Sequence, residues 1–309
     1  MDHLPTVIFR KTRAIVSRWI CIASILLIPS QAIAEKNIVI VSSDKNKHHQ
    51  SLVKNILSNL EASDIKAESF SLGQEININK KDKLIISLGQ EASSLIDKKE
   101  LSNPKLRVFT DDNPHIDPER KSESHLSMTQ PICQQLKLIN IINSEWKIIS
   151  VLLSTSDKYL IENLSLCAKQ FNLKIKTIIL DEYINIIDAL NSSLLKNDVV
   201  VALPDPAIYN SRTIKSILLT SYRHRVPIIG FSENFVRAGA LAAMHSSSKQ
   251  LSKQITELIE KHFNGENIDR HHYPKYFDVK INKNVARSLG INIPDRKVLT
   301  EKLQHNNNE

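Results

Sequence analysis

Apolar and polar positions alternate along the chain in blocks that predict strands and helices in turn. Ile38–Val41 is a short apolar run with β-branched residues, which is typical of a strand buried on both faces. Residues 50–60 then carry apolar side chains at helical spacing. Further strands are predicted at 64–72, 83–89, 106–109, 147–153, 174–180, 198–203, 227–230 and 276–281, and further helices at 90–95, 131–142, 158–171, 184–195, 208–223, 247–263 and 284–289. This alternation predicts an α/β fold with doubly wound parallel sheets.

The pattern breaks once, over residues 110–129, which contain Pro114, Pro118 and a run of charges. We interpret this stretch as the crossing between two lobes. Lobe 1 is predicted to span 35–125, with a possible return of segments from 245–309, and lobe 2 to span 126–244. Two open sheets of this kind predict a cleft between the carboxyl ends of their strands, where ligands bind.

The N-terminus has the layout of a secretory signal peptide. Residues 1–18 contain four basic residues against one acid, residues 20–28 are apolar, and Ala32-Ile33-Ala34 has small residues at a cleavage-site spacing. We therefore expect residues 1–34 to be removed by a cut after Ala34 and the mature protein to lie in the periplasm. An uncleaved anchor is the alternative, but the apolar stretch is shorter than the roughly 20 residues that a membrane span needs.

Charge and composition narrow the functional classes. Removing residues 1–34 lowers the net charge from +8 to about +5, and no basic block is interleaved with aromatic residues. Nucleic-acid binding is therefore disfavoured, and we expect a monomer that binds a small molecule. Neither a metal nor a cofactor is expected, because the chain shows no C-x-x-C, no phosphate-binding loop and no dinucleotide fingerprint.

Cys133 and Cys167 are the two cysteines outside the predicted signal peptide. In an oxidising compartment they could form a disulfide bond. They could equally be two buried free thiols on helix faces, because cysteine is among the most buried residue types. The sequence leaves both alternatives open.

Two turns after predicted strands could hold a ligand. Ser87, Gly89 and Gln90 stand where a strand ends and a helix begins, so free backbone N–H groups could attract an anion there; an ordinary turn relaxed by Gly89 is the alternative. Asp205 is placed to cap a helix with Pro206 at its first position, which local features favour. Asp205 could instead bind a ligand ammonium, and Tyr209 could stack or form a hydrogen bond.

A third turn follows the strand at 227–230. Ser232 is a candidate helix N-cap, and Phe231 is either an aromatic wall of the cleft or part of the core. Arg237 is interpreted as a structural ion-pair donor. Ser87, Ser232, His224 and His245 form no recognisable nucleophile–base arrangement, so a periplasmic hydrolase is disfavoured and we expect no enzymatic activity.

Several runs together resemble the periplasmic substrate-binding proteins of ABC transporters. These runs are Ala202–Ala207, Pro227–Ser232, Phe235–Ala243, Tyr273–Phe277 and Val285–Gly290. The most similar group has the type I periplasmic-binding-protein fold and includes tryptophan- and tyrosine-type binders. The first half of the chain resembles the family chiefly through Ser87-Leu88-Gly89 and Gln130-Pro131.

The resemblance implies three crossovers between the lobes, closure about a hinge, and delivery of a small, often amino-acid-like ligand to an ABC permease. By position it implies that the cleft is lined by the turns at 87–90, 205–209 and 231–233, so Phe231, Ser232 and Glu233 join the candidates. Asp111, in the loop after Phe109, is a further candidate. The same module could instead report ligand binding to a membrane signalling protein, and the sequence does not separate these two roles.

Overall fold

The computed structural model describes residues 35–43, 46–76, 78, 83–110, 122–155, 160–180, 185–194 and 197–304, without the side chains of 192 and 193. The fold below belongs to the unit Lys36–Glu309. The predicted signal peptide, its cleavage site at Ala34 and the candidate Asp111 lie outside the described residues. Within the described ranges, no helix has both the length and the apolar character needed to cross a bilayer.

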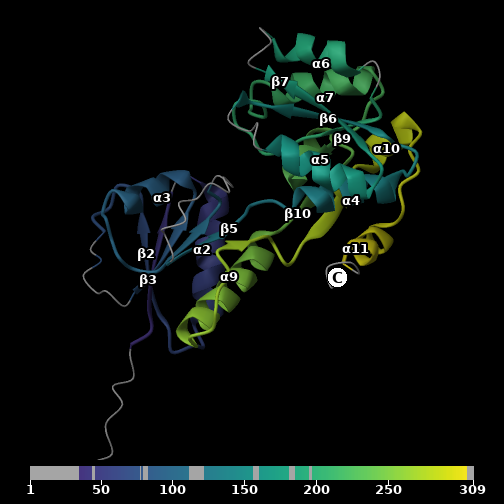
Figure 1. Cartoon of the computed structure of the whole chain (residues 1–309). Coiled ribbons are helices and arrows are strands. Elements are labelled where there is room, and N and C mark those ends of the chain that lie inside the picture. The colour runs from purple at the N-terminus through teal and green to yellow at the C-terminus, as the bar shows by residue number, and fades with distance from the viewer. Residues whose placement is uncertain are drawn as a thin grey trace, which may run out of the picture. The chain divides into compact units, whose positions relative to one another are not determined.

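The first sheet has six strands in the order β11-β5-β4-β3-β1-β2, and every neighbouring pair is parallel. Its strands are β1 (Asn37–Ser42), β2 (Lys66–Ser71), β3 (Lys83–Leu88), β4 (Lys105–Val108), β5 (Glu123–Leu126) and β11 (His271–His272). Helices α2 (Lys47–Leu60) and α9 (Ser248–Phe263) pack side by side on one face, and α3 (Gln90–Asp97) covers the other (Figure 1). Alternate residues of β1 and β3 enter the two cores, as strands buried on both faces require.

The second sheet repeats this arrangement. Its order is β12-β10-β9-β8-β6-β7, and only the β10–β12 pair is antiparallel among the described strands. The strands are β6 (Ile148–Leu153), β7 (Lys174–Ile179), β8 (Val199–Val201), β9 (Ile228–Gly230), β10 (Ala242–His245) and β12 (Asp278–Ile281). The helices are α4 (Ile132–Ile142), α5 (Leu160–Gln170), α6 (Ile186–Leu194), α7 (Ile214–Arg223), α8 (Glu233–Ala238), α10 (Lys283–Leu289) and α11 (Arg296–Gln304).

The prediction of two doubly wound, mostly parallel α/β sheets is confirmed. We call each sheet with its helices a lobe. The chain passes between the sheets three times: after β5, after β10 and after β11. Of the segments after residue 245, α9 and β11 belong with the first sheet, whereas β12 belongs with the second and α11 packs on its helix α4. The lobe boundaries at 125 and 244, and a cleft between the lobes, remain predictions.

Some elements were not predicted from the pattern. Strand β5 lies inside the stretch interpreted as irregular, and β10, β11 and α11 are also additional, whereas α8 was anticipated only through its candidate N-cap, Ser232. The helix predicted over 208–223 begins only at Ile214. Ahead of it, the side chains of Asn210 and Thr213 bond to nearby backbone groups and hold residues 206–213 in turns.

Helices α4 and α5 are joined covalently. The sulfur atoms of Cys133 and Cys167 are bonded, and the two Cα atoms lie 4.9 Å apart. The bond links the first helix after the crossover to the helix that follows β6, on the same face of the second sheet.

Candidate functional site

Each sheet has one point at which the order of the strands reverses direction. After β1 the chain moves outward to β2 and then back across to β3, and after β6 it moves to β7 and back to β8. The two helices that follow such a pair of strands lie on opposite faces, which leaves a crevice beyond the carboxyl ends of the strands. The segments that follow β1 and β3, and those that follow β6 and β8, are therefore the places where each lobe can hold a ligand.

In the first lobe, Gly89 and His49 lie in contact in the segments that follow β3 and β1. Gly89 directly follows β3 with φ of +88°, and its N–H donates to the carbonyl oxygen of Val108 at 2.8 Å. A Cβ atom at Gly89 would lie 2.9 Å from Cε1 of His49, which stands in the first turn of α2. Only glycine combines this backbone conformation with this approach.

His49 is a functional candidate that the sequence reasoning missed. Its Nδ1 is buried and has no hydrogen-bond partner among the described residues. Burial, followed by the nearby His48, lowers the pKa of His49, so the ring is neutral at neutral pH. Both imidazoles stack on Phe109, at centroid distances of 5.6 Å for His48 and 5.8 Å for His49. The sequence did offer one sign of this site: two adjacent histidines stand in the first turn of the helix that follows the first strand.

The other candidates of the first lobe have different environments. The Oγ atoms of Ser87 and Ser93 lie 2.7 Å apart, and both residues are buried. The hydroxyl of Ser87 is therefore used in a hydrogen bond inside the lobe. Gln90 is exposed at the first position of α3, and the N-cap residue of this helix, Gly89, has no side chain that could cap it. The backbone N–H groups at the start of α3 are therefore the groups that could meet an anion here.

In the second lobe Asp205 lies four residues beyond β8, and the residue is only 8% exposed. Its Oδ1 accepts from the backbone N–H of Ala207 at 2.8 Å, and its main-chain oxygen accepts from the N–H of Tyr209 at 2.7 Å. Because α7 begins at Ile214, Asp205 closes a turn, and the prediction that it caps the helix was wrong. Its Oδ2 is buried without a partner in the described structure.

Tyr209 adds a second buried polar atom that lacks a partner among the described residues, the phenolic oxygen. Its ring packs edge-on against Phe235 at 5.4 Å and Phe231 at 6.0 Å. Burial, followed by the charge of Asp205, raises the pKa of Tyr209, so the hydroxyl keeps its proton and can donate. A buried polar group without a partner costs about 1–3 kcal/mol, and a ligand could recover that cost.

In the third candidate turn, at 231–233, most side-chain polar groups already bond to other residues of the protein. The Oγ of Ser232 accepts from the N–H of Phe235 at 3.2 Å, so the predicted N-cap is confirmed. The carboxylate of Glu233 contacts Arg237 at 2.9 Å and Lys280 at 3.0 Å, and hydrogen bonds from Lys280 and Arg237 lower its pKa. Phe231 packs on Phe235 with ring centroids 5.0 Å apart and is half-buried, so part of its ring stays accessible.

The serines and histidines considered for a hydrolase have other partners in the part of the chain that the structure describes. Ser87 pairs with Ser93, Ser232 caps α8, and Nε2 of His224 contacts Asn191 at 2.9 Å. Among the same residues, no three His, Cys, Asp or Glu side chains are grouped so that they could hold a metal ion.

Two doubly wound sheets of identical strand order, joined by three crossovers, define the class of two-lobed proteins with the periplasmic-binding-protein fold. The sequence model of the family described as "ABC transporter substrate binding protein" matches residues 124–305, which is more than half of the chain. The chain therefore belongs to this family of substrate-binding proteins.

Several solved structures have the same fold. The ligand-free, open structure of CD0873, a substrate binding protein with adhesive properties from Clostridium difficile, has 17% identity and a TM-score of 0.65, and the match covers 85% of this chain and 97% of that one. The ABC domain in complex with L-Trp from Streptococcus pneumonia has 17% identity and a TM-score of 0.60, covering 87% and 98%. A periplasmic ribose ABC transporter structure from Conexibacter woesei has 9% identity and a TM-score of 0.54, covering 88% and 98%. At these identities the structures show the fold alone, and no curated protein sequence matched the chain.

Proposed function

We propose that this protein is an exported, non-enzymatic receptor that captures a small amino-acid-like molecule between its two lobes and presents it to an ABC permease. Family membership supports a substrate-binding role. The observation that carries the proposal is that, among the described residues, both lobes bury polar atoms without partners where their strands end: Nδ1 of His49 in one, and Oδ2 of Asp205 with the hydroxyl of Tyr209 in the other.

The chemistry of these groups suits an α-amino acid. The free carboxylate oxygen of Asp205 would accept from a ligand ammonium, and the protonated Tyr209 would donate beside it. The uncapped start of α3, next to Gly89 and Gln90, would receive the ligand carboxylate. The accessible part of Phe231 would contact the ligand side chain. The proposed sequence of events is export through residues 1–34, capture in the periplasm, closure about the three crossovers and release to the permease.

The proposal is tested by isothermal titration against a panel of amino acids and nucleosides, with small-angle scattering to detect compaction. We expect one class of ligand to bind and to reduce the radius of gyration. If no member of the panel binds and none compacts the protein, the proposal fails.

Asp205→Asn tests the role assigned to the carboxylate. Asparagine keeps the Oδ1 acceptor for the Ala207 N–H but removes the charge, so we expect affinity to fall at least tenfold with little change in stability. Asp188→Asn, which removes an exposed carboxylate from α6 of the same lobe, is the matched control. Equal losses of affinity and stability in Asp205→Asn would assign the carboxylate to the turn alone.

A further inference from the structure

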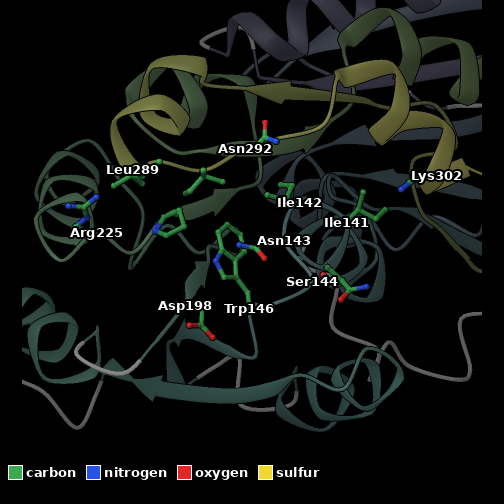
Figure 2. A pocket seen from close by; sticks show the side chains of 14 residues that line it. Ile141, Ile142, Asn143, Ser144, Trp146, Asp198, Arg225, Leu289, Asn292 and Lys302 are labelled. Atoms are coloured by element: carbon green, nitrogen blue, oxygen red, sulfur yellow. The ribbon is translucent and has the colours of Figure 1, made fainter.

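An open pocket of about 760 Å³ lies in the second lobe, at the edge of the sheet opposite to Asp205. Trp146, Asp198 and Pro227 line it, and they come just before β6, β8 and β9, so they mark the amino ends of these strands. The ends of α10 and α11 contribute Leu289 and Lys302 (Figure 2). All lining residues belong to one lobe, so the pocket is independent of any closure between lobes.

The lining combines an aromatic ring with two cations, Arg225 and Lys302, and one carboxylate, Asp198, so it carries a net positive charge. Trp146 is 9% exposed and stands between Arg225 and Lys302 in Figure 2. Within the described residues, neither of these two cations forms an ion pair or a side-chain hydrogen bond. The Oδ2 of Asp198 accepts from the backbone N–H groups of Lys147 at 2.7 Å and Ile148 at 2.8 Å, and among the described residues this carboxylate forms no ion pair with either cation.

Arg225 occupies a backbone position that favours glycine. It follows the C-cap of α7 with φ of +60°, and its N–H donates to the carbonyl oxygen of Tyr222 at 3.0 Å. The left-handed conformation is strained for a side chain with a Cβ, and glycine is the usual residue just past a helix end. Arginine is therefore present at a conformational cost, which suggests that its guanidinium is needed at the pocket.

We propose that this pocket is a second binding site, which takes a small organic anion with an aromatic ring. The acidic group pairs with the planar guanidinium of Arg225, whose donors match a carboxylate or a phosphate. Lys302 adds a second positive charge on the other side, and the ring lies against Trp146 and Pro227.

Intrinsic fluorescence tests the proposal directly. The chain has two tryptophans, and in the full chain carrying Trp19→Phe the tryptophan emission, excited selectively over that of tyrosine, comes from Trp146 alone. We expect benzoate or phenyl phosphate to change this emission saturably, with a dissociation constant at least tenfold lower than that of the neutral benzyl alcohol. Comparing the two anions separates carboxylate from phosphate recognition. No saturable change with either anion, or equal binding of benzyl alcohol, overturns the proposal.

Arg225→Gly separates a binding role from a structural one. We expect at least a tenfold loss of anion affinity together with a melting temperature that is unchanged or higher. Glu100→Gly is the matched control, because Glu100 is an exposed charged residue with φ of +49° in the first lobe, and it must leave anion affinity unchanged. Arg225→Gln, which keeps a polar, hydrogen-bonding side chain but removes the charge, must lose affinity as well; full affinity in either Arg225 variant overturns the proposal.

Discussion

Gly89 and His49 are packed so closely that a Cβ atom on the glycine would lie 2.9 Å from Cε1 of the imidazole. This contact joins the turn after β3 to the first turn of α2, which are 40 residues apart in the chain and meet because β1 and β3 are neighbours. Any side chain introduced at Gly89 therefore displaces the imidazole of His49, whose Nδ1 has no partner among the described residues.

Gly89→Ala is expected to lower both stability and ligand affinity. The positive φ alone costs about 1–2 kcal/mol for a residue with a Cβ, and the new methyl group also displaces His49. Gly73→Ala is the control, because Gly73 has φ of +96° but nothing lies within 4 Å of its Cβ position. Urea unfolding and ligand titration should show a larger loss of both quantities for Gly89→Ala. Equal effects of the two substitutions would mean that the contact with His49 contributes to neither stability nor ligand affinity.

Tyr209→Phe is expected to separate stability from binding. The hydroxyl is buried without a partner in the described structure, so its removal should leave the free energy of unfolding unchanged or raise it by about 1 kcal/mol. The aromatic contacts with Phe231 and Phe235 remain. Ligand affinity should fall because one donor is lost. A variant that binds as tightly as the parent would exclude the hydroxyl from the site.

Much of the fold could be predicted because its central strands are buried on both faces. All six residues of β1 and of β3 are buried, and such strands appear in the sequence as apolar blocks. Strand β5, with the sequence Glu-Ser-His-Leu, has no such block. Its Glu123 is buried only because Arg107 and Lys105 of β4 pair with it, at 2.9 Å and 3.2 Å, and this pairing depends on the strand order.

The residues of the candidate site also fall into those that the local sequence predicts and those that depend on the strand order. Gly89, Asp205 and Tyr209 could be proposed because each stands in the segment between an apolar strand and the helix that follows it. His49 was missed because it becomes a site residue only through the neighbourhood of β1 and β3, which the sequence does not show. The role of Asp205 as a helix cap was wrong because Asn210 and Thr213 hold the following residues in turns by local hydrogen bonds.

The disulfide between Cys133 and Cys167 is expected to stabilise the second lobe. It closes a loop with a sequence separation of 34, for which loop-closure entropy predicts a contribution of about 3–4 kcal/mol. Reduction with dithiothreitol should therefore lower the melting temperature. The double variant Cys133→Ala/Cys167→Ala should melt at the reduced protein's temperature and be insensitive to dithiothreitol. A parent protein whose melting temperature does not respond to complete reduction would contradict this prediction.

A buried charged cluster in the first lobe predicts how stability depends on pH. Arg107 and Glu123 pair across β4 and β5, and His125 lies beside them on β5. The Nδ1 of His125 contacts Oγ1 of Thr110 at 3.3 Å, and its Nε2 is buried without a partner among the described residues. Burial, and then the charge of Arg107, lower the pKa of His125 from 6.5 to about 4.

Because the folded state binds this proton less readily than the unfolded state, stability should be highest above pH 6.5 and fall as the pH decreases toward 4. A shift of this size corresponds to about 3 kcal/mol. His125→Gln removes the titrating group, so its free energy of unfolding should change less over this interval than that of the parent. The measurement is urea unfolding at several pH values for both proteins. Since other histidines titrate in both, the informative quantity is the difference between the two curves, and a difference that stays constant from pH 7 to pH 4 would refute the assignment to His125.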